Sequence, residues 1–113
     1  MQAPQAALLL RIYTEEGRFH EHRPLYEYIV VKAREKKLAG ATVLRGPMGF
    51  GVRATIHTAK IADLAAKLPL LIEIVDSEEK IRSFVAELDM VEELGLVTLE
   101  KVEVVHYGSA PTQ

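Results

Sequence analysis

The order in which two hydrophobic periodicities follow each other limits the fold of this chain more than any other feature. Short apolar runs are typical of buried strands, whereas apolar residues three and four positions apart are typical of amphipathic helices. The patterns predict helices that begin near Pro24 and Ser77, and strands at residues 6–13, 41–45, 52–57, 68–75 and 96–107. Four of these five strand patterns fit the order strand, helix, strand, strand, helix, strand, which predicts an α+β ferredoxin-like split βαβ sandwich (β-α-β-β-α-β), a four-stranded antiparallel sheet with two helices on one face.

The ends of both helices carry recognisable signals. Pro24 suits a first helical turn, and the pattern after it continues for about 14 residues to Gly40, a candidate C-terminal cap. The second helix begins at an Asp-Ser pair followed by two glutamates, a good N-terminal signal. Its apolar face holds Ile81, Phe84, Val85 and Leu88. Residues 58–67 suit either a short helix or a packed connection.

Composition excludes several classes of function. The 113 residues, 49% of them hydrophobic, predict a single domain over residues 1–113 with flexible tails at 1–6 and 108–113. A net charge of −2 argues against nucleic-acid binding, and the absence of cysteine rules out disulfides, thiolate metal sites and a cysteine nucleophile. Because there is no targeting signal and no apolar run near the ~18 residues of a membrane span, we expect a cytoplasmic protein without membrane insertion.

The segment from Arg45 to Arg53 is the best candidate for a functional loop. It holds three of the seven glycines, at positions 46, 49 and 51. Glycine lets a partner approach the backbone closely, and free backbone N–H groups can face an anion, to which the two arginines add charge. A hairpin connection whose glycines serve only geometry explains the same residues.

The histidines and carboxylates give weaker signals. His20 and His22 have a spacing that would place both imidazoles on one side of an extended segment, but a solvated surface loop explains them better, and we predict no metal site. His57, at a strand end, either acts near the loop or closes a backbone hydrogen bond. Glu73 lies within an apolar strand and is expected to pair with Arg45 or Arg53. No serine or carboxylate pair has the context of a catalytic group, and we predict no catalytic residue.

Successive blocks of the sequence resemble a known family. They are LRIY at 10–13, LYEYIV at 25–30, LAGATVLRG at 38–46, GFG at 49–51, IHT at 56–58 and LPLLIEIVD at 68–76. In this order, over residues 8–107, they resemble the domain-of-unknown-function family DUF190. That family is similar in fold to the PII signalling proteins, so the resemblance implies a homotrimer of ferredoxin-like subunits with a long loop between the second and third strands.

The resemblance also implies a function. PII proteins bind adenine nucleotides between subunits, and their long loop then engages or releases a channel, a transporter or an enzyme. For this chain, it implies a small anion or adenine nucleotide held near residues 45–58, with these candidate ligand-binding residues: Arg45, Gly46, Gly49, Gly51, Arg53 and His57. At the place of a second, lysine-bearing phosphate loop of PII proteins, the chain has Glu92 and Glu93.

Two other functions remain open beside the regulator. A protein-interaction module without a ligand would dock through Pro47, Met48 and Phe50, because methionine and aromatic residues are favoured in interface cores. A small enzyme acting in a cleft with His57 as its base is the third hypothesis, ranked last.

Overall fold

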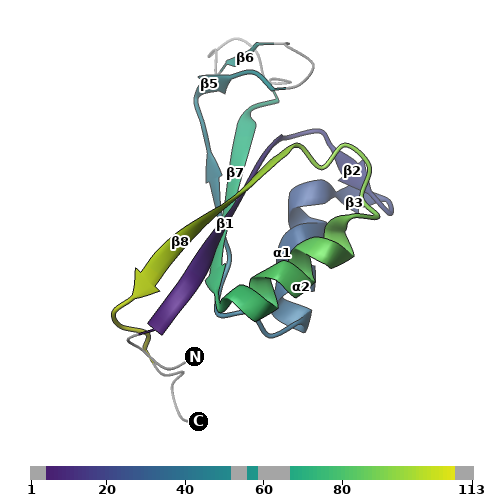
Figure 1. Cartoon of the computed structure of the whole chain (residues 1–113). Coiled ribbons are helices and arrows are strands. Elements are labelled where there is room, and N and C mark those ends of the chain that lie inside the picture. Colours follow the sequence, from purple (N-terminus) through teal and green to yellow (C-terminus); the bar gives the residue numbers. More distant parts are fainter. Residues whose placement is uncertain (1–4, 52–55, 59–66, 109–113) are drawn as a thin grey trace.

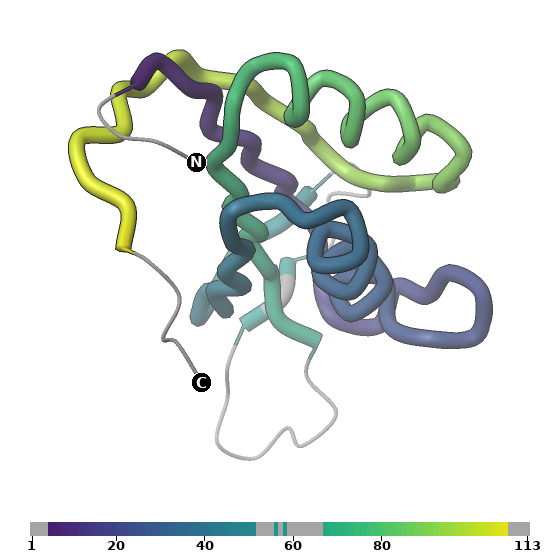
Figure 2. The backbone as a smooth tube through the Cα atoms, turned by 90° about the horizontal axis from the view of Figure 1, so that it is seen from below, coloured from purple at the N-terminus to yellow at the C-terminus, as the bar shows by residue number. Residues whose placement is uncertain are grey.

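The computed structural model of the chain describes residues 5–51, 56–58 and 67–108 (Figure 1). Its main sheet has the strand order β4-β7-β1-β8, and each neighbouring pair is antiparallel. The strands are β1 (Gln5–Glu15), β4 (Thr42–Arg45), β7 (Pro69–Asp76) and β8 (Leu96–Val104), and the helices are α1 (Leu25–Glu35) and α2 (Glu78–Leu88). Both helices lie on one face of the sheet (Figure 2). The predicted α+β ferredoxin-like fold is thereby confirmed.

Two short ribbons extend this frame. The strands β2 (Phe19–His20) and β3 (Arg23–Pro24) form a hairpin before α1, and β5 (Met48–Gly49) pairs with β6 (His57–Thr58). The β5–β6 ribbon lies beyond the end of the sheet where β7 begins (Figure 1). The predicted strand at 52–57 was partly wrong, because its described end pairs with β5 and not with the main sheet. Residues 52–55, and 59–66 in the undecided segment, lie outside the described residues.

The core lies between the sheet and the helices. Alternate side chains of β7 are buried, as expected for a strand with one face on the core. These side chains meet one stripe from each helix, and the largest fully buried members are Leu10, Ile12, Leu25, Ile29, Ile72, Ile74, Ile81, Phe84 and Leu88. Three of the four residues predicted for the apolar face of α2 belong to this cluster, and Val85 packs against it.

The opposite face of the sheet carries a cross-strand ion network. Arg11 Nε lies 3.0 Å from Glu73 Oε2, and Arg11 Nη1 lies 2.9 Å from Glu100 Oε1. The hydrogen bond to Glu73 is the main cause that raises the pKa of Arg11. Glu73 therefore pairs with Arg11 and not with Arg45, because the register of β1 and β7 places Arg11 directly opposite Glu73. Arg53, the other expected partner, lies outside the described residues.

The helix ends agree with the sequence signals at α2 but not at α1. Ser77 caps α2, its Oγ accepting a hydrogen bond from Lys80 N at 3.3 Å. Helix α1 ends at Glu35, earlier than predicted. Lys37 adopts a left-handed φ of 60°, and its N–H and that of Leu38 donate to the carbonyls of Arg34 and Ala33, a Schellman motif. Gly40 is therefore not the cap.

Candidate functional site

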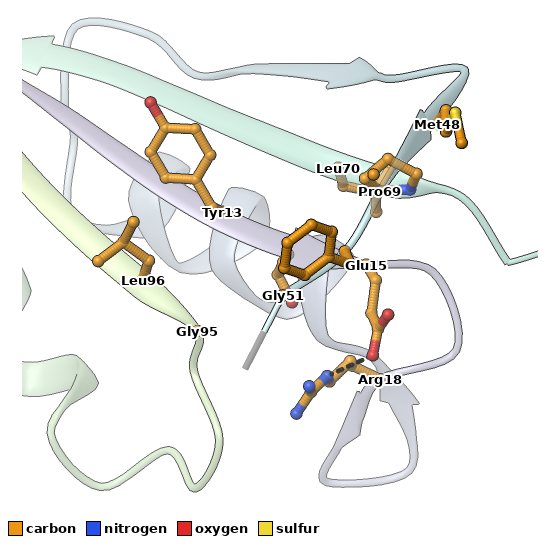
Figure 3. Close-up of a pocket in the computed structure, with 12 residues that line it drawn as sticks. Tyr13, Glu15, Arg18, Met48, Gly51, Pro69, Leu70, Gly95 and Leu96 are labelled. Atoms are coloured by element: carbon orange, nitrogen blue, oxygen red, sulfur yellow. Dashed lines mark hydrogen bonds and ion pairs between the residues drawn. The ribbon is translucent and has the colours of Figure 1, made fainter. Parts of the chain in front are cut away.

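A pocket of about 330 Å³ lies between the glycine-containing loop and the end of the sheet (Figure 3). The loop contributes Met48, Gly49, Phe50 and Gly51 to its wall. The fixed wall comes from the ends of three strands and the turns beside them, with Tyr13, Thr14, Glu15, Arg18, Pro69, Leu70, Gly95 and Leu96. The pocket therefore joins a connecting segment to the rigid frame of the molecule.

Two of the three loop glycines are explained by packing. A Cβ at Gly46 or at Gly49 would lie 3.2 Å from Cγ of Pro69, so both positions let the loop close over the proline ring. The N–H of Gly46 donates to the Pro69 carbonyl at 2.9 Å, so this donor does not face an anion. Gly51 has open space around its Cα, so the structure gives it no packing role.

Of the predicted cationic residues, Arg45 can be placed, and it lies away from the pocket wall. Arg45 is exposed, and its Nη2 lies 2.8 Å from Glu16 Oε2, so its charge is paired. Neither Arg45, Gly46 nor Pro47 lines the pocket. Arg53 lies outside the described residues, as does the side chain of His57. Their role in binding stays a prediction.

Among the described residues that line the pocket, Arg18 is the cation, and sequence reasoning missed it. Its side chain is only 14% exposed, and it donates to Glu15 Oε1 at 3.2 Å and to Glu93 Oε2 at 3.0 Å. It also donates to the Glu93 carbonyl at 3.2 Å. The acidic pair before β8 was the available signal, because arginine is a common partner of such a carboxylate. Any anion that reaches Arg18 must compete with these two carboxylates.

The opposite wall is shaped by a close approach of two backbones. Gly95, with a φ of 108°, lies so near β1 that a Cβ would collide with the carbonyl oxygen of Tyr13. The next residue of β1, Thr14, has a buried Oγ1 without a hydrogen-bond partner among the described residues. An unpaired buried hydroxyl is uncommon and needs an explanation. Here it lies in a residue that lines the pocket.

The loop also presents two large apolar side chains to solvent. Met48 is 62% exposed and Phe50 is 70% exposed, and Pro47 beside them is exposed as well. Both Met48 and Phe50 line the pocket with part of their surface. The loop tip can therefore contact a bound molecule and an outside partner.

The pocket shares a wall with the open face of the sheet. Tyr13 lies opposite Leu96 on β8 and opposite Leu71 on β7, on the side away from the helices. Leu96 is 58% exposed, and Leu44 on β4 is 48% exposed on the same face. A second molecule that covered this face would also lie against the pocket.

The His20 and His22 pair does not have the geometry expected from its spacing. Glu21 and His22 have left-handed φ values of 52° and 66°, so they form a tight turn and not an extended segment. Within residues 5–51, 56–58 and 67–108, no group of three or more His, Cys, Asp or Glu side chains could hold a metal ion. In the same residues, no helix is long and apolar enough to cross a membrane.

Comparison with known sequences gives a family match over most of the chain. The model of the DUF190 family, described as "Uncharacterized ACR", matches residues 7–104. A UPF0166 protein of Aquifex aeolicus is 43% identical over 98 residues, which are 87% of this chain and 92% of the relative. A UPF0166 protein of Methanocaldococcus jannaschii is 34% identical over 94 residues, covering 82% of this chain and 86% of the relative.

Solved structures show the same fold. CPII from Thiomonas intermedia, bound to ADP and bicarbonate, superimposes with a TM-score of 0.66 at 17% identity, covering 90% of this chain and 91% of CPII. A protein from Thermus thermophilus, described as PII-like, gives a TM-score of 0.61 at 19% identity, covering 88% and 90% of the two chains. At these identities the likeness establishes the fold.

Proposed function

Because this chain belongs to the DUF190 family, we propose that it is a PII-like regulatory protein. It binds a small anionic ligand in the pocket beneath the loop and transmits the bound state to a partner protein. The observation that carries this proposal is the construction of the pocket, with one wall from the loop and the other from the sheet and Arg18. A ligand that contacts both walls favours one loop position over others by its differential affinity.

The side chains around the pocket suit an adenine nucleotide. Tyr13 and Phe50 offer aromatic surface for a base. Arg18 offers a guanidinium for a phosphate oxygen. The fold-level likeness to CPII, which was solved with ADP and bicarbonate, supports the same class of ligand here.

A ligand that binds Arg18 must displace at least one of the two carboxylates paired with its guanidinium. Glu93 is 60% exposed at its side chain, so it can leave the guanidinium more readily than Glu15, which is 17% exposed. A phosphate on Arg18 would release Glu93 and so loosen the turn before β8. Ligand binding would thus act on two segments, the loop at 46–51 and this turn.

The proposed assembly is a homotrimer, as the resemblance to PII proteins implies. The open face of the sheet exposes Leu44 and Leu96 around the Arg11 network. Burying an exposed apolar face against another copy is a common reason for a small domain to form a closed oligomer. Since Tyr13 and Leu96 belong both to this face and to the pocket, a neighbouring subunit would complete the site.

Hydrogen exchange tests whether the ligand acts on the loop. We expect ADP to slow amide exchange at residues 48–51 and to change it at residues 93–95, while α2 stays unaffected. Phe50→Ala should weaken the effect on the loop, and Met90→Ala, which removes an exposed side chain outside the pocket, serves as the matched control. Unchanged exchange at residues 48–51 in saturating ADP would reject transmission through this loop.

A ligand-independent interaction module is the second candidate, favoured by the exposure of Met48 and Phe50. In this case, Phe50→Ala should abolish capture of a partner protein from cells without altering affinity for any nucleotide. Met90→Ala should capture the partner as wild type does. A partner retained by Phe50→Ala would reject the module. PII-like signalling proteins are not enzymes, and we assign no reaction to this chain.

A further inference from the structure

The ring of Tyr28 on α1 contacts one imidazole and two cationic side chains, which come from β2, β3 and α1. The imidazole of His20, on β2, meets the ring edge to face, with centroids 4.4 Å apart and an interplanar angle of 66°. Arg23 Cζ, on β3, and Lys32 Nζ, one turn further along α1, each lie 5.8 Å from the ring centroid. Cation–π attraction holds both charges at one place on the surface.

The hairpin fixes this arrangement through its backbone. Two consecutive residues with positive φ, Glu21 and His22, form the turn that suits a two-residue hairpin. The turn places Arg23 directly opposite His20 in the β2–β3 register. At the base of the hairpin, the N–H of Leu25 donates to the Arg18 carbonyl at 2.8 Å. The cations are therefore presented by a short, closed ribbon packed against α1 (Figure 1).

The positive charge of this cluster is not neutralised internally. Arg23 and Lys32 form no ion pair with a carboxylate anywhere in the described part of the chain, whereas Arg11, Arg18 and Arg45 do. An acidic neighbour is Glu21, whose Oε1 lies 3.9 Å from His20 Nε2. Next to the cluster, Phe19 is 68% exposed. Arginine and aromatic side chains are enriched in protein interfaces and among their energetic hot spots.

We propose that the β2–β3 hairpin and the adjoining face of α1, with Phe19, His20, Arg23, Tyr28 and Lys32, form a docking surface for an acidic segment of a partner protein. Charge complementarity selects this partner, because two fixed cations without carboxylates attract glutamate or aspartate side chains. Phe19 adds an apolar contact beside them. Among these residues, none lines the pocket beneath the loop, so the docking surface does not depend on the proposed ligand.

The probe for this surface is an octapeptide of six glutamates and two leucines. Its binding is measured by the changes in the amide chemical shifts of the full chain. There are two reference ligands at the same ionic strength. One is the same peptide with glutamine in place of glutamate, and the other is inorganic phosphate. The test variant is Arg23→Ala/Lys32→Ala. The matched control is Arg34→Ala/Lys80→Ala, which removes the same number of positive charges elsewhere on the helices.

We expect the acidic peptide to shift amides within residues 19–32, and the test variant to weaken its binding by about tenfold, with the control unchanged. Equal weakening in both variants, or shifts spread over other surfaces, would overturn the proposal. Equal shifts with phosphate would also overturn it, in favour of a site for small anions. Because this test contains no nucleotide, its outcome is independent of ligand binding beneath the loop.

Discussion

At Gly95, one hydrogen atom in place of a side chain allows the turn before β8 to contact the Tyr13 carbonyl. The backbone there has a φ of 108°, which side-chain-bearing residues rarely adopt. Because Gly95 also lines the pocket beside Tyr13, we regard it as part of the site. The sequence alone did not indicate it, since a single glycine after an acidic pair shows no close approach to a distant strand.

Gly95→Ala should therefore lower the free energy of unfolding by about 2–4 kcal/mol, because it adds both a steric collision and an unfavourable φ. Denaturation in urea measures the change. The control is Gly40→Ala, since a Cβ at Gly40 would meet no heavy atom within 4 Å. If both variants were destabilised equally, the close contact with Tyr13 would not be the cause.

Lys37 has a left-handed backbone conformation that residues with a Cβ rarely adopt. It occupies the left-handed position of the Schellman motif that ends α1, where glycine is usual. We expect Lys37→Gly to raise the free energy of unfolding by about 0.5–1 kcal/mol, because it relieves the strain of a left-handed residue with a Cβ. Lys37→Ala is the control and should bring no such gain. A loss of stability in Lys37→Gly would contradict this account.

Among the elements, the two helices and the four strands of the main sheet could be predicted because each has a periodic apolar pattern. The end of α1 could not, since Gly40 gave a stronger signal than Lys37 for a cap. The pairing of β4 with β7 and the β5–β6 ribbon also depend on contacts between distant segments, which periodicity does not report. The site was found only in part, because Arg18 and Tyr13 reach the pocket through the fold.

An ion pair connects the two helices, and its pH dependence is testable. Lys36 Nζ lies 2.7 Å from Glu87 Oε1, and the hydrogen bond to Glu87 is the main cause that raises the pKa of Lys36 above 10.5. A raised pKa in the folded state stabilises the fold while lysine is charged, and this contribution disappears as the pH rises through the folded-state pKa. We expect Lys36→Met to be slightly less stable than wild type at pH 7.

That difference should shrink as the pH rises through the raised pKa of Lys36, where the lysine of the wild type loses its charge. Urea titrations of both proteins at several pH values measure it, and Arg82→Met, which breaks an exposed pair within α2, is the comparison. Since both partners are partly exposed, the effect is small. A difference that stays constant with pH would show that the pair does not act through charge.

For the whole molecule, the open face of the sheet is the surface that we propose for assembly. We expect Leu44→Asp to convert the proposed trimer into monomers, because it places a charge in the apolar part of that face. Light scattering after size exclusion measures the mass. Met90→Asp, which changes an exposed apolar side chain between α2 and β8, should leave the trimer intact. A wild-type protein that is monomeric at all concentrations would reject the assembly.

Calorimetric titration of the purified chain with ADP measures whether the pocket beneath the loop binds an adenine nucleotide, as we propose. We predict saturable binding that Phe50→Ala and Arg18→Gln weaken, while Arg82→Gln leaves it unchanged. At a concentration of ADP about 100-fold above Kd, the ligand should stabilise the fold by about 2.7 kcal/mol and raise Tm accordingly. Absence of heat and of any Tm change with ADP, AMP and ATP would contradict the account.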